Sequence, residues 1–307
     1  MQKLFERARG FIYRNARPLD FARWRFHFEG GSPEDVLRAL AAYQNPDGGF
    51  GHGLEADALN PNSSPIQTWC ATTILREVDQ LDPRHPIVSG IVRYLTGGEH
   101  FDGRCWAWSI PTNNDHPHAP WWHFSGPADG VNYNPTASLA GFLLRTGEPG
   151  TRAWNLGSRI AEEAADFYLS GQAGIEMHLI PCFLPLAADL AAALPSFPLL
   201  PSLTAKLRKD ARACILQDAD KWAGNYCAHP SDFIAGRSDP LYCCFSEVAE
   251  RECAFIQTTQ APSGAWPITW SWGDYPDAFA VSANHWQSTL VIKNLLYLKG
   301  MGRLEAA

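Results

Sequence analysis

The feature that most constrains the fold is a short pattern that occurs twice, far apart in the chain: Gln, three residues, Gly, one residue and an aromatic residue. The first copy is QNPDGGF at 44–50, and the second is QAPSGAW at 260–266. Each copy follows a segment whose apolar residues recur at helical spacing. A helix followed by a Gly-containing turn, used again later in the chain, indicates an architecture of repeated helical hairpins.

Weaker versions of the pattern lie between these two copies. The stretch from Tyr94 to Trp106 has Glu99 in place of the Gln and one inserted residue. Gln172 and Gln217 follow two further amphipathic segments. The marker positions are irregularly spaced, as expected for a diverged helical repeat.

Helical periodicity extends through most of the chain. Ser32-Pro33 and Asn134-Pro135 each place a capping residue before a proline at the first helical position. Strand patterns are nearly absent, and no Pro/Ser-rich linker divides the chain. The sequence therefore predicts an all-α protein that forms a single domain over residues 1–307. The segments with the clearest helical spacing are 36–43, 64–78, 135–145, 158–169, 203–217, 246–258 and 283–298.

Composition and charge argue against several classes of binding partner. The formal net charge is −7, with 25 basic residues scattered among 32 acidic ones, which argues against nucleic acid and anionic membranes as partners. No segment reaches the roughly 20 apolar residues that an integral membrane helix needs. The N-terminus lacks the apolar stretch of a secretory signal, and the eight cysteines lack the spacing of a disulfide scaffold. We therefore expect a cytoplasmic protein with reduced thiols.

The repeated pattern resembles a known family motif. Gln-x-x-x-Gly-x-Trp/Phe is similar to the QW motif of squalene and oxidosqualene cyclases, and YQNPDGGFG at 43–51 resembles the turns of protein prenyltransferase β subunits. The resemblance implies an α/α toroid, in which inner and outer helices surround a central cavity. It also implies that the Gln side chain satisfies amides at a helix N-terminus while the aromatic ring packs beneath it. The residues with this scaffold role are Gln44, Gly48, Phe50, Gln260, Gly264 and Trp266.

In such a toroid, the residues just after each motif are the best placed to face a ligand. His52, Glu55 and Asp57 follow the first copy in a Gly-rich loop. A carboxyl group beside an apolar cavity has a raised pKa, which suits a general acid. The alternative is a structural role, in which either acid caps a helix or pairs with an arginine such as Arg23 or Arg25.

A second candidate group lies in NNDHPHAPWWHF at 113–124. Trp121, Trp122 and His123 are candidates for covering the cavity and binding the substrate. The spacing is a weak match to any metal motif, and we expect no metal there. The side chains that offer metal-ligand atoms are Asp115, His116, His118 and His123.

A third candidate pair is His178 and Cys182. They stand four residues apart, which predicts that they share one face of an apolar helix, with Glu176 beside them. Protein prenyltransferases hold zinc with Asp, Cys and His, but their ligand motif has no residue-by-residue match here. A catalytic role competes with ordinary burial of both side chains in the core.

A fourth group follows the second motif copy, in WPITWSWGDYPDAF at 266–279 and the helix after it. Indole faces in this group are suited to stabilising a carbocation by cation–π attraction or to stacking on a sugar, and core packing is the alternative. The candidate side chains are Trp270, Trp272, Asp277, His285 and Trp286.

The acidic motifs of both terpene cyclase classes, Asp-x-Asp-Asp and Asp-Asp-x-x-Asp, are absent from the sequence. The sequence therefore favours cofactor-independent acid–base chemistry, of the lyase, isomerase or cyclase kind, on an apolar or isoprenoid-like small molecule. Glu55 or Asp57 is expected to donate the proton, and His52, His178 or His285 to accept it.

Two other functions remain open at this point. An α/α barrel also suits a glycosidase or polysaccharide lyase, in which two carboxylates such as Glu55 and Asp277 flank the scissile bond. The third possibility is a non-catalytic binding protein that shares only the fold.

Overall fold

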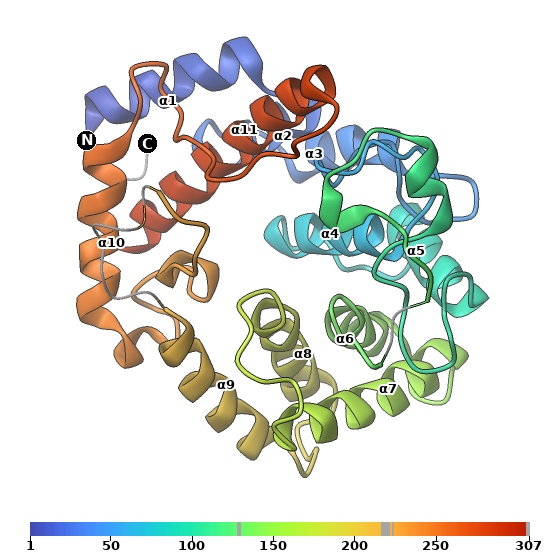
Figure 1. Ribbon diagram of the computed structural model, residues 1–307. Coiled ribbons are helices and arrows are strands. Elements are labelled where there is room, and N and C mark those ends of the chain that lie inside the picture. The colour runs from blue at the N-terminus through green and yellow to red at the C-terminus, as the bar shows by residue number, and fades with distance from the viewer. Residues whose placement is uncertain (128–129, 216–221, 223, 305–307) are drawn as a thin grey trace. The chain divides into compact units, whose positions relative to one another are not determined.

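A computed structural model describes residues 1–127, 130–215, 222 and 224–304 (Figure 1). Within these residues the regular elements are eleven α-helices and several short 3₁₀ helices, with isolated bridges and no β-strand. The all-α prediction is therefore confirmed. The chain forms two compact units, residues 40–210, here called the central unit, and residues 1–39 with 211–307, here called the terminal unit. The expectation of a single domain stays a prediction.

The central unit is built around α6 (Thr136–Thr146). This helix is buried along nearly its whole length and packs against both α7 (Arg152–Leu169) and α8 (Ile180–Ala193) (Figure 1). Because it has neighbours on several sides, apolar and small residues occur all round it, and only Arg145 is exposed. The other regular elements of the unit are η1 (Ala41–Tyr43), α4 (Pro65–Glu77), α5 (Pro86–Gly97), η2 (Pro111–Asp115), η3 (Pro120–Trp122) and most of α9 (Leu200–Cys214).

An ion pair joins two helices of the central unit. Arg76 near the end of α4 binds Asp189 on α8 through two hydrogen bonds of 2.8 and 2.6 Å. The Asp189 side chain is 5% exposed and that of Arg76 is 21% exposed. Such bidentate geometry in a mostly buried position fixes how the two helices meet.

The terminal unit brings both ends of the chain together. Helices α1 and α2 pack against α11, and an aromatic cluster fills the space beside α1. In this cluster the Trp24 ring lies 5.2 Å from Phe5 and 4.7 Å from Phe28, measured between centroids. The elements of the unit are α1 (Gln2–Asn15), α2 (Pro18–Phe28), most of α3 (Pro33–Leu40), η5 (Pro230–Asp232), η6 (Tyr242–Cys244), α10 (Ser246–Thr259) and α11 (Pro276–Gly300).

Each of the seven predicted helical segments overlaps an observed helix, although the boundaries differ by several residues in places. The expected start at Ser32-Pro33 is confirmed, because Ser32 Oγ accepts the Asp35 amide at 3.2 Å. The expected start at Pro135 is wrong, since this proline precedes α6 and the helix begins at Thr136. The prediction of a helix face shared by His178 and Cys182 is also wrong, because α8 begins only at Ile180.

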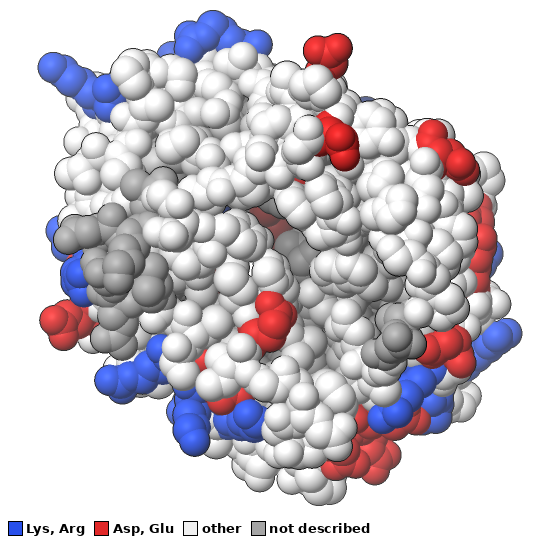
Figure 2. All heavy atoms as spheres, in the orientation of Figure 1, with Lys and Arg blue, Asp and Glu red and all other residues white. Residues whose placement is uncertain are grey.

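The described residues contain no helix that is long and apolar enough to cross a membrane. On the face shown in Figure 2, Lys and Arg atoms and Asp and Glu atoms occur in small groups among uncharged atoms. This pattern agrees with the dispersed charges of the sequence.

Candidate functional site

The first motif copy forms a turn that docks on the first turns of α5. The side-chain amide of Gln44 donates to the carbonyl oxygens of Gly48, at 3.0 Å, and Ile87, at 3.1 Å. Gly48 has a φ of +97°, and a Cβ at this position would lie 2.1 Å from the carbonyl oxygen of Gly90. Phe50 is fully buried. The turn therefore requires Gly, both for its backbone conformation and for the close approach to α5.

The second copy docks on α1 in the same way. Gln260 donates to the carbonyl oxygens of Gly264, at 2.9 Å, and Leu4, at 3.0 Å. Gly264 has a φ of +100°, and a Cβ there would lie 2.1 Å from the carbonyl oxygen of Arg7. Trp266 is buried like its counterpart in the first copy. In both units the Gln and the Gly contact helix carbonyls that are three residues apart.

These contacts correct one detail of the expected motif chemistry. The Gln side chains were expected to satisfy amides at a helix N-terminus, but each Gln donates to carbonyl oxygens instead. A carbonyl oxygen has two lone pairs, so a carbonyl inside a helix can accept this second bond.

The weaker copies do not repeat this arrangement. The side chain of Glu99 is 59% exposed, unlike the partly buried Gln44 and the buried Gln260. Gly103 keeps the left-handed backbone, with φ +98°, but an added Cβ would meet no atom within 4 Å. Gln172 is exposed in a turn after α7. Gln217 lies outside the described residues.

The loop after the first motif copy carries two buried acids. Glu55 is 7% exposed and Asp57 is 2% exposed. Glu55 Oε2 accepts the Asp57 amide at 2.9 Å. His52 is held at the start of the loop, where its Nε2 lies 2.9 Å from Asn45 Oδ1. The predicted loop acids are therefore enclosed by protein instead of displayed on the surface.

This loop is paired with the loop that contains the second candidate group. The Leu59 amide donates to the carbonyl oxygen of Pro117 at 3.0 Å, and the Ala119 amide to that of Asp57 at 2.8 Å. His118 therefore lies opposite Ala58 in an isolated antiparallel bridge. Backbone hydrogen bonds thus bring the acidic loop and the histidine loop together within one unit.

The histidine loop contains a pair of imidazoles. His118 Nε2 lies 3.2 Å from His123 Nδ1, and the two rings are stacked at 19°. His118 is buried, whereas His123 is exposed. Trp122 is buried against Trp108, and Trp121 is 39% exposed. Of the two tryptophans predicted to bind substrate, Trp121 offers the more accessible ring.

The described residues contain no group of three or more His, Cys, Asp or Glu side chains that could hold a metal ion. The four ligand candidates of this loop, Asp115, His116, His118 and His123, therefore do not converge on a metal site.

The two residues of the third candidate group, His178 and Cys182, lie in different environments. The His178 side chain is 45% exposed, and its Nδ1 lies 2.5 Å from Glu176 Oε1 in the turn before α8. Cys182 is fully buried on α8 and donates to Asn134 Oδ1 at 3.3 Å. Burial raises the pKa of the Cys182 thiol, and the charge of Glu176 raises it further. A protonated, buried thiol is typical of a core cysteine and unsuited to metal binding.

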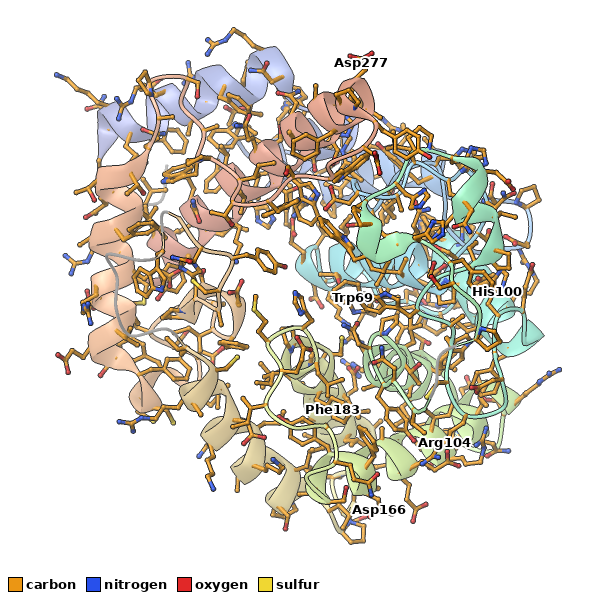
Figure 3. The ribbon with its side chains drawn as sticks, in the orientation of Figure 1. Trp69, His100, Arg104, Asp166, Phe183 and Asp277 are labelled. Atoms are coloured by element: carbon orange, nitrogen blue, oxygen red, sulfur yellow. The ribbon has the colours of Figure 1, made fainter. Side chains whose placement is uncertain are left out.

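In the terminal unit, the aromatic candidates pack against other aromatic rings. The Trp270 ring meets those of Trp286 and Tyr226 edge-on, at centroid distances of 5.4 and 5.5 Å. Trp272 is 2% exposed. Asp277 is exposed in the first turn of α11 and lies at the end of this helix in Figure 3. It belongs to a different unit from Glu55, so their pairing across a glycosidic bond stays a prediction.

His285 has the most unusual environment of the predicted histidines. Burial, together with the positive charge of Arg17, lowers the pKa of His285 to about 4, so the ring is neutral at pH 7. Its buried Nδ1 has no hydrogen-bond partner among the described residues. A pKa this low makes the imidazole a weak base, so its expected role as proton acceptor stays a prediction.

Sequence reasoning did not nominate the ion cluster beside this histidine. Asp20 is completely buried and binds Arg17 at 2.7 Å and Arg23 at 3.1 Å. Burial alone would raise the pKa of Asp20, but the two guanidinium groups hold it below its ordinary value. The spacing of three residues on either side of Asp20 was the available signal in the sequence.

A second polar cluster was also missed. Glu252 on α10 is 1% exposed and accepts both the hydroxyl of Ser231, at 2.6 Å, and its amide, at 2.9 Å. His229 Nδ1 lies 3.3 Å from the same carboxylate. Lys293 of α11 pairs with Asp232. These bonds attach η5 to both helices. The cluster therefore has a structural role.

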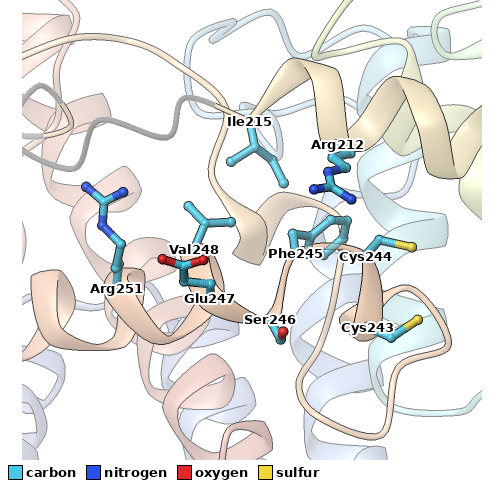
Figure 4. A pocket seen from close by; sticks show the side chains of 9 residues that line it. All are labelled: Arg212, Ile215, Cys243, Cys244, Phe245, Ser246, Glu247, Val248 and Arg251. Carbon is cyan, nitrogen blue, oxygen red and sulfur yellow. The ribbon is translucent and has the colours of Figure 1, made fainter.

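The terminal unit also has a cavity of about 230 Å³ at the start of α10 (Figure 4). Figure 4 shows the Arg212 guanidinium beside Phe245 and Cys244. None of the candidate residues predicted from the sequence lines this cavity.

No family model, curated protein or solved structure significantly matches this chain. The resemblance to a family therefore depends on the two motif copies and on the geometry that they share.

Proposed function

We propose that the chain is an acid–base enzyme related to the terpene cyclases and protein prenyltransferases. It acts without a cofactor on an apolar or isoprenoid-like small molecule, as a lyase, isomerase or cyclase. We further propose that its helical hairpins form an α/α toroid. The support is that the Gln and Gly of both motif copies make equivalent contacts, against α5 in one unit and α1 in the other.

The observation that carries the proposal is the pairing of two buried acids with a histidine loop. Glu55 and Asp57 are 7% and 2% exposed, and the Asp57 carbonyl oxygen accepts the Ala119 amide at 2.8 Å, one residue after His118. This backbone bond joins the loop of the enclosed acids to the loop of His118, and acids and histidines in one region are typical of proton-transfer sites.

The proposed chemistry assigns a role to each group. Glu55 or Asp57 protonates the substrate, and a histidine removes a proton from the resulting cation. The hydrogen-bonded pair of His118 and His123 extends from the buried loop to the exposed side, which suits it to carry that proton to solvent. The exposed ring of Trp121 is suited to shelter positive charge by cation–π attraction.

The test uses a panel of isoprenoid alcohols, prenyl diphosphates and oligosaccharides. Thermal-shift measurements identify the compounds that stabilise the protein. Reactions in deuterium oxide, followed by mass spectrometry, then detect solvent protons that the enzyme adds to the product. Stabilisation and deuterium incorporation with an isoprenoid support the proposal. Stabilisation by oligosaccharides alone overturns it in favour of a carbohydrate-active enzyme.

Variants locate the acid. Glu55→Gln or Asp57→Asn is expected to lower the turnover rate by about 100-fold or more, as for removal of a general acid. The matched control is Asp115→Asn, because Asp115 is an exposed acid in the same loop as His118. Equal rates in all three folded variants would show that neither buried acid is catalytic.

A further inference from the structure

A second cavity, of about 380 Å³, opens in the central unit beside the first motif turn. Its lining comes from residues 45–47 of that turn, residues 62–63 before α4, residues 99–100 after α5, and Thr112 in η2. None of the residues assigned to the proposed active site lines it. Its volume is within the range of small-molecule sites in proteins.

Two hydrogen-bonding atoms of the lining, on Asp47 and Asn62, are unused acceptors. Asp47 Oδ1 accepts the Gly49 amide at 2.9 Å and the Ser63 hydroxyl at 2.8 Å, while its Oδ2 has no such partner among the described residues. Asn62 uses its side-chain nitrogen to bind Asn60 at 3.0 Å, which leaves its side-chain oxygen available. A ligand for these atoms must therefore supply hydrogen-bond donors.

The cavity also carries negative charge that its own histidine does not neutralise. Glu99 Oε1 lies 3.8 Å from His100 Nε2. Burial lowers the pKa of His100, which outweighs the opposing effect of Glu99 and Asp47, so the imidazole is neutral at pH 7. Arg93 binds the backbone carbonyls of residues 46 and 47, at 3.0 and 3.3 Å, and does not line the cavity.

A buried tyrosine of α5 is influenced by both carboxylates without lining the cavity. Tyr94 is 3% exposed, and its hydroxyl has no hydrogen-bond partner in the described part of the chain. Burial raises the pKa of Tyr94, and the charges of Glu99 and Asp47 raise it further. Tyr94 is therefore a neutral, buried neighbour of the cavity and not a direct contact of its occupant.

The backbone of His100, which lines the same cavity, has an unusual conformation. Its φ is +56°, a left-handed conformation that is uncommon for residues other than Gly. Backbone of this kind is enriched at ligand sites.

We propose that this cavity binds a small organic cation with primary ammonium groups, held by the carboxylates of Asp47 and Glu99 and by Asn62. An organic cation is favoured over a metal ion, because the described residues include no group of three His, Cys, Asp or Glu side chains able to hold one. This site is additional to the proposed active site and does not depend on it.

The test is isothermal titration calorimetry on the full chain with 1,4-diaminobutane at physiological salt. Butane-1,4-diol is the matched probe, because it has the same length and no charge. We expect binding of the diamine and none of the diol. No heat with the diamine, or equal affinities for the two probes, would overturn the proposal.

Variants separate a specific site from general attraction to an acidic protein. Glu99→Gln removes a cavity carboxylate with an exposed side chain and is expected to weaken diamine binding about 10-fold or more, as for loss of one charge-assisted bond. Glu148→Gln removes the same charge from an exposed turn outside the cavity and is expected to leave the affinity unchanged. Equal weakening by both would show that binding is non-specific.

Tyr94→Phe gives an independent measurement. Because it removes a buried hydroxyl without a partner, we expect it to preserve or raise the melting temperature of the free protein. It should leave the stabilisation that the diamine confers unchanged, because Tyr94 does not line the cavity. A full diamine shift in Glu99→Gln would contradict binding in this cavity.

Discussion

The side-chain amide of Gln260 donates to the carbonyl oxygen of Leu4 at 3.0 Å, although the two residues are 256 positions apart in the sequence. This bond attaches the turn after α10 to the first turn of α1. Gln44 and Ile87 form the equivalent bond in the central unit. In each unit the stability of a helix start thus depends on a turn elsewhere in the chain.

The first prediction tests whether the Gln260 side chain is the donor in this hydrogen bond. In Gln260→Glu, an ionised carboxylate faces two carbonyl oxygens in a buried position, so we expect unfolding to become easier by about 2–4 kcal/mol at pH 7.5. The new carboxyl group has a higher pKa in the folded state than in the unfolded state, because only its neutral form can donate a bond here. The difference in the free energy of unfolding between Gln260→Glu and the unmodified protein should therefore become smaller as the pH falls toward 5.

Urea denaturation at pH 7.5 and pH 5 measures both effects. The matched control is Gln257→Glu, one turn earlier on α10, where the side chain is partly exposed and donates to Met1 sulfur at 3.1 Å. We expect this control to change the free energy of unfolding by no more than about 0.5 kcal/mol. Equal losses in the two variants would contradict a donor role for Gln260.

The second prediction separates backbone strain from steric contact. Gly48 and Gly98 have similar left-handed conformations, with φ of +97° and +89°. A Cβ at Gly98 would meet no atom within 4 Å, whereas one at Gly48 would lie 2.1 Å from the carbonyl oxygen of Gly90. Gly98→Ala should therefore cost about 1 kcal/mol through strain alone. Gly48→Ala should cost about 3 kcal/mol or more, because α5 must also move.

Chemical denaturation of both alanine variants provides the measurement. The quantity that tests the docking contact is the difference between their free energies of unfolding. If Gly48→Ala were no more harmful than Gly98→Ala, the close approach of the turn to α5 would not contribute to stability.

The helices were predictable where one face is largely apolar over several turns, as in α7 and α10. Helix α1 has the same kind of pattern, with Leu4, Ala8, Phe11 and Ile12 buried. Its many charged residues make this apolar face harder to recognise in the sequence. The start of α8 was harder to place, because Leu179, Ile180 and Phe183 continue one apolar run across it. Apolar composition alone does not show where a helix begins.

The candidate sites were predictable only where their residues are close in sequence. Glu55 and Asp57 occur in one Gly-rich loop, so the sequence was sufficient to nominate them. Their pairing with the loop of His118 depends on backbone bonds between segments about 60 residues apart, which no local pattern encodes. The same holds for Asp47 and Glu99, which meet at a cavity only after α5 has docked on the motif turn.

The third prediction concerns the ion pair between α4 and α8. Asp189→Asn leaves the Arg76 guanidinium without its carboxylate in a mostly buried position. We expect a loss of about 2–3 kcal/mol in the free energy of unfolding, because the desolvated cation is no longer compensated. The measurement is urea denaturation at neutral pH.

The control for this variant is an ion pair of similar length on the surface. Arg159 and Glu163 lie 2.8 Å apart on α7, with 45% and 34% of their side chains exposed. Glu163→Gln should change stability by about 0.5 kcal/mol or less. A cost as small as this in Asp189→Asn would show that the helix contact does not depend on the buried pair.

The last prediction follows from the low pKa of His285, which is about 4 in the folded protein against an ordinary value of 6.5. Between these values, the unfolded chain binds a proton at this position and the folded chain does not, so stability must fall as the pH decreases from 7 to 4.5. We expect this residue to account for about 1–2 kcal/mol of that fall, since its ring is only partly shielded from water. In His285→Gln the position no longer titrates, and the loss of stability from pH 7 to pH 4.5 should be smaller by the same amount. Urea denaturation at several pH values checks this, and parallel stability curves for the two proteins would contradict a neutral, buried imidazole beside Arg17.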